Sequence, residues 1–504
     1  MKQALLIFFF FLPLYVLSMG GHGYGGVGTT TYAVTEAIWR RRTFAITPVP
    51  WGKFGRDGQF YAQYGIGHSL YNLPFYGGGR LLIKIFPALA PQAERITMFA
   101  TLLGQPFISA LTCALLLLFC RKLGYSSQTA ILCALCYGLG TQAWMYAQLD
   151  FSEPILAFFL LGAAYWLYAG NKENSRRNLF CAGLFLGIAI TVKVAALILL
   201  PVFLGYLYSA PAVDRKARYR YLRAFVAPLF VCGIGVVSLY NAIRFGDPFE
   251  TGYDNEFNFY YKYVLQQFWN NLLSLEGSIF FYSPVILFGF FGITRFYQRF
   301  KAFALFVGGL MLTFLLFYPF TTNELYYGPR YLTPTLPFFM LLAGAWSDMP
   351  GTFRSAGHVA RRLRAIGIGA LLLSGIFHQL LGVVVNYHTY YWRIRYTLPL
   401  AAESVRTSLV GQILQATPQL PHLLGHVWLV KQAIRHLWQP GGLPFGGVTL
   451  LADATQQNAW LPYYGLDLWW CNPNLHRLLG WKITGAIVAI LLSVLSLSLY
   501  RLRR

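Results

Sequence analysis

The segment MFATLLGQPFISALTCALLLLFCRK, residues 98–122, decides the fold class of this chain. Its first 23 residues carry no charged side chain, and the run then meets Arg121 and Lys122. A helix that crosses a bilayer needs about 20 predominantly apolar residues. Lysine and arginine collect in cytoplasmic loops. The segment therefore predicts a transmembrane helix that ends on the cytoplasmic face.

Similar apolar segments recur along the chain. Of its 504 residues, 56% are hydrophobic and 11% are charged, whereas a soluble domain carries about 25% charged residues. We therefore predict an all-α polytopic integral membrane protein with about twelve transmembrane helices, two of them paired as a short-helix hairpin. The predicted spans are roughly 4–19, 98–120, 128–147, 153–170, the hairpin 179–191 with 194–208, 224–243, 279–294, 302–320, 334–347, 366–385 and 483–500.

The charged residues agree with this topology. If Lys2 lies inside, every basic cluster also falls inside: those near 121, 172–177, 215–223, 295–301 and 354–364, and the tail RLRR. We therefore expect both termini in the cytoplasm. The expected location of the chain is the inner or plasma membrane of the cell. Only three of the seventeen acids, Glu173, Asp214 and Asp348, fall there. The net charge of +23 is therefore a topology signal, and we predict no nucleic-acid partner. The first segment lacks an A-x-A-like cleavage site, so we expect a retained helix.

Three large external regions are predicted, at about 20–97, 244–278 and 386–481. The expected organisation is a core over 1–350, a cytoplasmic loop and helix over 351–385, an external region over 386–481, and a final helix with a basic tail over 482–504. Aromatic residues above the bilayer suit a ligand with a lipid tail and a polar head. Membrane lipids are expected neighbours.

Other chemistries lack their motifs. No Walker loop, dinucleotide fingerprint, G-x-S-x-G or H-E-x-x-H is present, and no dense cluster of His, Cys and acids marks a metal site. Acids are almost missing from the spans, which argues against a proton relay through the membrane. Six of the seven cysteines lie in spans, where packing explains them.

Several motifs share their order with a known superfamily. The first external loop contains Asp57-Gly58, Phe60-Tyr61 and Leu73-Pro74-Phe75, and it is followed by FFYSPVILFGFFG (280–292) and YYGPRYLTPTLPF (326–338). Over roughly residues 1–350 the chain resembles bacterial GT-C glycosyltransferases, which use polyprenyl-phosphate sugars and include protein O-mannosyltransferases and aminoarabinose transferases of lipid A. Two departures stand out. The first acid of the loop is only Glu36, and Gln63 replaces a usual lysine.

The resemblance implies transfer of a hexose or pentose from a polyprenyl-phosphate donor to a lipid, glycan or protein acceptor on the external or periplasmic face. Such a site needs one carboxylate to accept the acceptor's proton and cations to stabilise the leaving phosphate. Asp57 is the predicted general base, with Glu36 second. No cofactor is certain, and a divalent metal is possible. The predicted substrate ligands are Arg330, Lys193, Arg244, Tyr327 and His68, and the predicted metal or acceptor ligands are Asp150 and Glu153.

Each of these residues also has an ordinary structural interpretation. Asp57-Gly58 is a common turn dipeptide, and a membrane-surface arginine or lysine can snorkel to the headgroups. Two other functions stay open. A ligase or polymerase of polyprenyl-diphosphate-linked glycans would rely on Arg and His, and a lipid or glycan transporter or flippase would show an inverted repeat.

Overall fold

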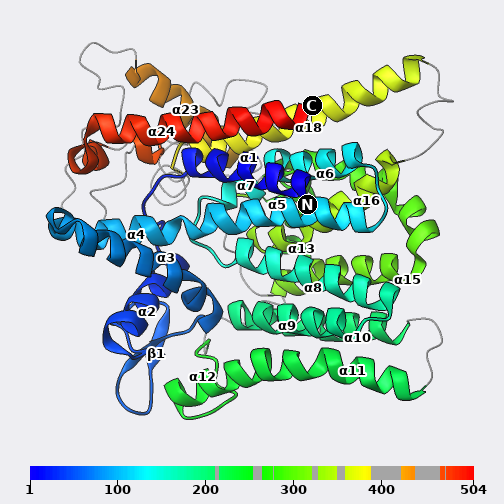
Figure 1. Cartoon of the computed structure of the whole chain (residues 1–504), viewed down its shortest axis with the longest axis horizontal. Coiled ribbons are helices and arrows are strands. Elements are labelled where there is room, and N and C mark those ends of the chain that lie inside the picture. Colours follow the sequence, from blue (N-terminus) through cyan, green and yellow to red (C-terminus); the bar gives the residue numbers. More distant parts are fainter. Residues whose placement is uncertain are drawn as a thin grey trace.

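Helices form nearly all of the structure, a computed structural model that describes residues 1–209, 215–253, 264–275, 277–320, 327–348, 358–386, 422–437, 466–471 and 473–503 (Figure 1). The first half contains α1 (Lys2–Ser18), α2 (Val27–Arg41), α3 (Ile66–Ile85), α4 (Ala93–Leu102), α5 (Gly104–Lys122), α6 (Ser127–Gly140), α7 (Ala143–Tyr146), α8 (Glu153–Glu173), α9 (Arg176–Val192), α10 (Leu200–Tyr208), α11 (Arg215–Leu229) and α12 (Val236–Phe245). The second half contains α13 (Val264–Leu273), α14 (Ile279–Tyr282), α15 (Leu287–Phe317), α16 (Leu336–Ser347), α18 (His358–Val384), α23 (His422–Leu437) and α24 (Pro473–Arg503). Short 3-10 or π segments are η1 (Pro87–Gln92), η2 (Val194–Leu199), η3 (Phe230–Gly235), η4 (Pro284–Ile286), η5 (Tyr318–Phe320), η6 (Arg330–Thr335) and η9 (Trp469–Cys471).

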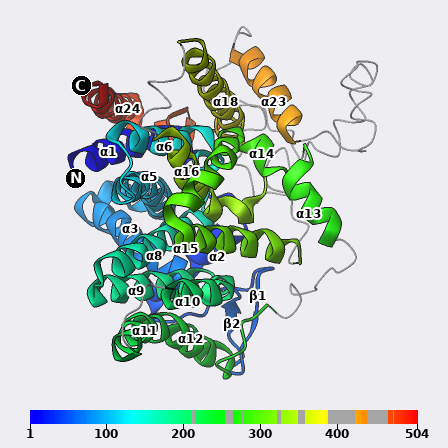
Figure 2. The same ribbon diagram turned by 90° about the vertical axis from the view of Figure 1, so that its right-hand side faces the viewer.

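The predicted all-α membrane architecture is confirmed. Six helical stretches in the described part are long and apolar enough to cross a membrane, and three shorter apolar helices accompany them. Most of these helices lie roughly parallel or antiparallel to one another in Figure 1 and are seen along their axes in Figure 2. The protein is therefore a multi-pass membrane protein, and the expected total of twelve spans stays a prediction.

Two breaks divide long helical stretches as the sequence predicts. Lys193 is extended (φ −148°, ψ 110°) and separates α9 from η2 and α10. Phe300 (φ −136°, ψ 45°) interrupts α15 between the predicted segments 279–294 and 302–320. A non-helical residue cannot continue the i to i−4 hydrogen bonds, so each break lets the chain reverse or bend. The break at Lys193 places a cation at the end of α9.

The first external loop folds into α2, a two-stranded hairpin and α3. Strands β1 (Gly52–Phe54) and β2 (Phe60–Ala62) pair antiparallel, with Lys53 opposite Tyr61. Gly58 has φ of +74° at the hairpin turn, a conformation that glycine adopts without strain. In Figure 1 this hairpin and α2 lie together at one end of the bundle.

The two ends of the chain lie side by side. α1 and α24 pack together and run in opposite directions, so the marked N and C ends are close in both views (Figures 1 and 2). The indole N–H groups of Trp469 and Trp470 donate to the carbonyls of Val16 and Leu17, each at 2.7 Å. These bonds satisfy carbonyls that every helix leaves unpaired at its carboxyl end. Most of the predicted region 386–481 lies outside the described residues, so its boundaries stay a prediction.

Two of the three acids predicted inside have basic partners from other helices. Glu173 pairs with Lys122, and Asp348 lies 3.6 Å from Arg299. Asp214, the third, lies outside the described residues. The basic clusters that follow separate spans therefore meet their acids at one end of the bundle, which is consistent with a shared cytoplasmic side.

Candidate active site

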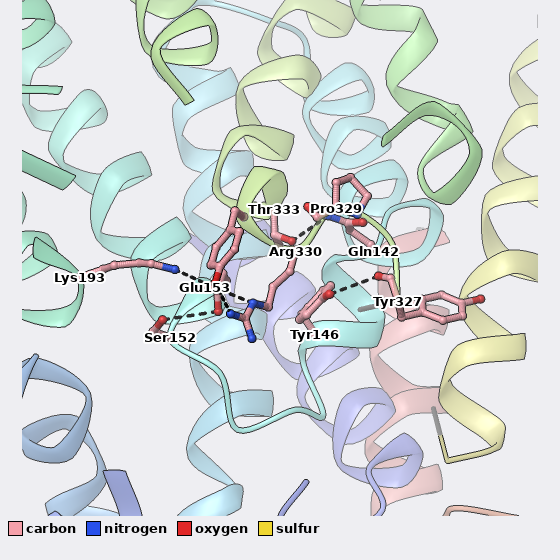
Figure 3. Close-up of polar contacts among 10 residues, drawn as sticks. Gln142, Tyr146, Ser152, Glu153, Lys193, Tyr327, Pro329, Arg330 and Thr333 are labelled. Atoms are coloured by element: carbon pink, nitrogen blue, oxygen red, sulfur yellow. Dashed lines mark hydrogen bonds and ion pairs between the residues drawn. The ribbon is translucent and has the colours of Figure 1, made fainter. Parts of the chain in front are cut away.

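The ends of three helical elements bring a carboxylate and two cations together (Figure 3). Glu153 is the first residue of α8, Lys193 follows the last residue of α9, and Arg330 opens η6. Pro154 takes the first turn of α8, where its missing N–H costs nothing. The three side chains come from separate elements that share one end of the bundle.

The carboxylate of Glu153 forms ion pairs with both Lys193 and Arg330. Its Oε1 lies 2.8 Å from Nζ of Lys193 and 3.4 Å from Nε of Arg330. Its Oε2 accepts a hydrogen bond of 3.4 Å from the hydroxyl of Ser152. Glu153 is 1% exposed and Arg330 is 6% exposed. Because these charges are removed from bulk water, their mutual attraction is stronger than that of a surface pair.

Aromatic rings form the walls around the two cations. The ring of Tyr331 lies 4.0 Å from Nζ of Lys193 and 4.5 Å from the guanidinium carbon of Arg330. Phe151 lies 4.6 Å from the same guanidinium carbon, and Tyr318 stacks on Tyr331 with centroids 4.7 Å apart. Arg330 Nη2 also donates to the Tyr331 hydroxyl at 2.6 Å. The rings stabilise positive charge and exclude water.

A buried amide fixes the loop that carries Arg330. Nε2 of Gln142 donates to the Pro329 carbonyl at 3.1 Å and to the Thr333 hydroxyl at 2.8 Å. The Tyr146 hydroxyl donates to the Tyr327 carbonyl at 3.2 Å (Figure 3). These bonds flank Arg330 on both sides along the chain, so its backbone is held in place before any ligand arrives.

His68 lies near this cluster. Its Nε2 is 3.2 Å from Nε2 of Gln105, while Nδ1 has no hydrogen-bond partner among the described residues. Burial lowers the pKa of His68 to about 4, and the Glu153 carboxylate opposes that shift. His68 is therefore neutral at physiological pH and offers a hydrogen-bond donor rather than a charge.

Asp150 lies three residues before Glu153 and is 6% exposed. Neither carboxylate oxygen has a well-aligned hydrogen-bond partner in the described part, although the backbone N–H groups of Asp150 and Tyr24 lie close enough to favour its charged form. Burial raises the pKa of Asp150 to about 7. A carboxylate with a pKa near neutrality and unused acceptor positions is suited to take a proton.

Asp57, the predicted general base, lies away from the partners of Glu153: no contact of its carboxylate with Lys193 or Arg330 occurs among the described residues. Asp57 is exposed on the hairpin turn, and its two oxygens accept hydrogen bonds from Gln59 N at 3.1 Å and the Tyr61 hydroxyl at 2.6 Å. The Tyr61 hydroxyl and then the Gln59 amide lower the pKa of Asp57. Its carboxylate closes the turn, as Asp-Gly dipeptides commonly do. Its catalytic role stays a prediction without a supporting contact.

The second predicted base, Glu36, lies on the surface of α2. Its Oε1 accepts from Arg40 Nη1 at 2.9 Å, one helical turn away, and from the Tyr76 hydroxyl at 3.3 Å. Such i,i+4 pairs are typical of solvated helix faces. Its catalytic role also stays a prediction.

Arg244 and Tyr327, two predicted substrate ligands, are engaged elsewhere. The Arg244 guanidinium donates to the Ala62 carbonyl and, at 2.7 Å, to Oδ1 of Asn241. The Tyr327 hydroxyl donates to the His378 carbonyl on α18, pointing away from Glu153 (Figure 3). Arg244 thus ties α12 to strand β2, and Tyr327 ties its loop to α18. Substrate binding by either stays a prediction.

A second polar cluster was not anticipated from the sequence. Oδ1 of Asp467 lies 2.7 Å from Nε2 of His22, and its Oδ2 accepts from the Tyr24 hydroxyl at 2.8 Å. Nδ1 of His22 faces the Gly23 carbonyl at 3.1 Å. Burial by itself would lower the pKa of His22, but the Asp467 carboxylate outweighs it and the pKa is raised. No spacing in the sequence relates these residues.

A divalent metal was considered possible at Asp150 and Glu153. Among the described residues, no group of three or more His, Cys, Asp or Glu side chains is arranged to hold a metal ion. Glu153 is occupied by two cations, and a metal prefers several oxygen ligands at once. The described residues around Asp150 and Glu153 therefore do not fit a metal site.

The fold and the site define a class: a mainly helical multi-pass membrane protein with two cations paired to a buried carboxylate at the end of its bundle. Residues 91–212 match the family model for dolichyl-phosphate-mannose-protein mannosyltransferase. This confirms the resemblance to protein O-mannosyltransferases over that segment, which contains Asp150, Glu153 and Lys193. No curated protein matches the chain.

Several solved structures are similar at low sequence identity. ArnT from Cupriavidus metallidurans in the apo state is 15% identical with a TM-score of 0.49, covering 84% of this chain and 72% of that one. The same protein bound to undecaprenyl phosphate is 16% identical with a TM-score of 0.47, covering 84% and 74%. The Archaeoglobus fulgidus oligosaccharyltransferase in its apo form is 12% identical with a TM-score of 0.49, covering 83% of this chain and 59% of that one.

Proposed function

We propose that this protein is a membrane glycosyltransferase that moves a hexose or pentose from a polyprenyl-phosphate carrier to a lipid, glycan or protein acceptor. The observation that carries the proposal is the convergence of Lys193 and Arg330 on Glu153 between aromatic rings. Paired cations that face one buried point are suited to bind a phosphate, and Arg does so with a planar fork of donors. The family match over residues 91–212 supports the same chemistry.

The site lies at the end of the bundle opposite the pairs formed by Glu173 and Asp348. If those pairs mark the cytoplasmic side, the reaction takes place on the external or periplasmic face of the cell membrane, and both chain ends are cytoplasmic. A polyprenyl tail would then stay in the bilayer while its phosphate reaches Lys193 and Arg330.

The reaction is a single displacement at the anomeric carbon of the sugar. The acceptor's oxygen or nitrogen forms the new bond, the bond from that carbon to the phosphate oxygen breaks, and the phosphate leaves with the electron pair. Lys193 and Arg330 stabilise the charge that develops on the phosphate. We assign the acceptor's proton to Asp150, because its oxygens have unused acceptor capacity and its pKa is raised to about 7.

Transfer assays on the purified full-length protein, with a panel of polyprenyl-phosphate hexoses and pentoses, test the proposal. Lys193→Gln and Arg330→Gln should abolish transfer, and Asp150→Asn should lower kcat by about 10²–10⁴-fold. Asp57→Asn is the matched comparison and should stay within about twofold of the original rate, since its exposed carboxylate bonds Gln59 and Tyr61 of its own hairpin. Loss of transfer in Asp57→Asn with full activity in Asp150→Asn would reverse the assignment of the base. Full activity in folded Lys193→Gln and Arg330→Gln variants would refute the function.

A further inference from the structure

Glu153 occupies the position at which an anionic ligand of Lys193 and Arg330 would bind. Its Oε1 contacts both cations, at 2.8 and 3.4 Å, so it competes with any phosphate for their charge. Its place is fixed, because it opens α8 beside Pro154 and its other oxygen is bonded to Ser152. Both oxygens of Glu153 already contact other groups, and its charge is paired with two cations, so it is a poorer general base than Asp150.

We propose that Glu153 determines the charge specificity of the phosphate site. Its fixed negative charge weakens binding of the doubly charged polyprenyl-phosphate product more than binding of the singly charged sugar-linked donor, and so promotes product release. This inference rests on the proposed function, because it assumes that Lys193 and Arg330 bind the phosphate of the carrier.

The reaction itself changes the charge of the ligand. The donor is a phosphodiester with one negative charge. The product is a phosphate monoester, whose second pKa of about 6 gives it nearly two negative charges at neutral pH. Two cations without a counter-ion would therefore bind the product more tightly than the donor, and release would limit turnover.

A fixed carboxylate offsets this tendency in proportion to the ligand's charge. Coulomb repulsion from Glu153 acts about twice as strongly on a dianion as on a monoanion at the same place. The aromatic walls formed by Tyr331, Tyr318 and Phe151 exclude water, which keeps the repulsion large. The carboxylate also stabilises the two buried cations while the site holds no ligand.

Binding of three matched ligands to the full-length protein in detergent tests the inference. The probes are a polyprenol, its methyl phosphodiester and its phosphate monoester, which carry about zero, one and two negative charges at pH 8. Glu153→Gln should leave the polyprenol's affinity unchanged, and it should tighten binding by about tenfold for each negative charge on the ligand. In transfer assays the same variant should lower KM for the donor and lower kcat, because product release becomes slower.

Two controls separate charge from structure. Glu153→Asp keeps the negative charge, so it should not tighten binding in proportion to the charge of the ligand. Glu94→Gln makes the Glu-to-Gln change at an exposed position in the first turn of α4. If Glu153→Gln is too unstable to purify, Lys193→Gln is compared with the Lys193→Gln/Glu153→Gln double variant. In that pair the charge of Glu153 is removed while Arg330 alone remains beside it, instead of two cations.

The outcomes distinguish this inference from the function on which it rests. If the original protein binds the phosphate monoester no better than the polyprenol, and Lys193→Gln changes nothing, the phosphate site itself is refuted. If the monoester binds better and Lys193→Gln weakens it, but the removal of the Glu153 charge leaves its affinity unchanged or weaker, only the role of Glu153 is refuted.

Discussion

The carboxylate of Asp467 lies 2.7 Å from Nε2 of His22, although the two residues are 445 positions apart in the chain. The Tyr24 hydroxyl bonds the same carboxylate at 2.8 Å. Trp469, two residues after Asp467, donates its indole N–H to the end of α1. The C-terminal segment therefore fixes the start of the first external loop, which continues into α2 beside Asp150.

The pair of His22 and Asp467 should make stability depend on pH. Both ring nitrogens of His22 face acceptors, so the imidazolium is favoured and its pKa is raised in the folded protein. This contribution is complete below the ordinary value of about 6.5 and is lost as pH rises through the folded value. Asp467→Asn should lower stability by about 1.5–3 kcal/mol at pH 6 and by less at pH 8. Thermal unfolding followed by tryptophan fluorescence measures both.

Tyr24→Phe is the matched control for that prediction. It removes the other hydrogen bond to Asp467 without changing a titratable charge near neutral pH, so it should cost about 0.5–1.5 kcal/mol equally at pH 6 and pH 8. Burial also raises the pKa of Asp150, so Asp150, like His22, makes the folded protein less stable as pH rises. The comparison between variants isolates His22. Equal pH dependence in Asp467→Asn and the original protein would contradict the prediction.

The sequence predicts the helices well because an apolar run of about 20 residues has few alternatives to a membrane span. It also predicts breaks at Lys193 and between the two parts of α15, where charged residues interrupt such runs. It does not predict which helix ends meet, since that depends on the packing of side chains across the bundle. The sequence therefore identifies Lys193 and Arg330 only singly, and it predicts another role for their shared partner Glu153.

The choice of Asp57 as the predicted base and the omission of Asp467 have the same origin. An Asp-Gly dipeptide in an external loop is compatible with a turn or with a catalytic acid, and only the fold shows that Asp57 points to solvent. Asp467 belongs to a region without a recognisable motif, and its carboxylate reaches the first loop through tertiary structure alone. Acids near a membrane surface cannot be assigned from their neighbours in sequence.

Replacement of Arg244 should affect stability and not phosphate binding. Its guanidinium bonds the Ala62 carbonyl and Asn241, and it lies 3.7 Å from the Tyr240 ring. Arg244→Met leaves these groups unsatisfied and should cost about 2–4 kcal/mol. The folded fraction should bind polyprenyl phosphate with unchanged affinity. The exposed Arg56→Ala serves as control and should change stability by no more than about 0.5 kcal/mol. Weaker binding at unchanged stability would instead make Arg244 a phosphate ligand.

Two substitutions at Tyr331 separate its ring from its hydroxyl. Tyr331→Phe keeps the ring 4.0 Å from Lys193 but removes the acceptor of Arg330 Nη2, and it should weaken polyprenyl-phosphate binding by about tenfold. Tyr331→Leu also removes the cation–π contact and should weaken binding by about a further tenfold. Tyr71→Phe, which removes a hydroxyl bonded to the Gly104 carbonyl, should leave binding unchanged. Equal affinities for the Phe and Leu variants would show that the ring contributes nothing.

A methyl group on Gly28 should disable Asp150 without touching the site's cations. A Cβ at Gly28 would lie 1.6 Å from Oδ2 and 1.8 Å from Cγ of Asp150, a distance that real atoms never adopt. Gly28→Ala must therefore displace the carboxylate, and kcat should fall by about 10²-fold or more, as expected for a lost or misplaced base. Binding of polyprenyl phosphate at Lys193 and Arg330 should be retained. Gly78→Ala, in α3, is the control, since a Cβ there meets nothing within 4 Å and should leave kcat unchanged. Retained kcat in a folded Gly28→Ala variant would show that the position of Asp150 is not required for transfer.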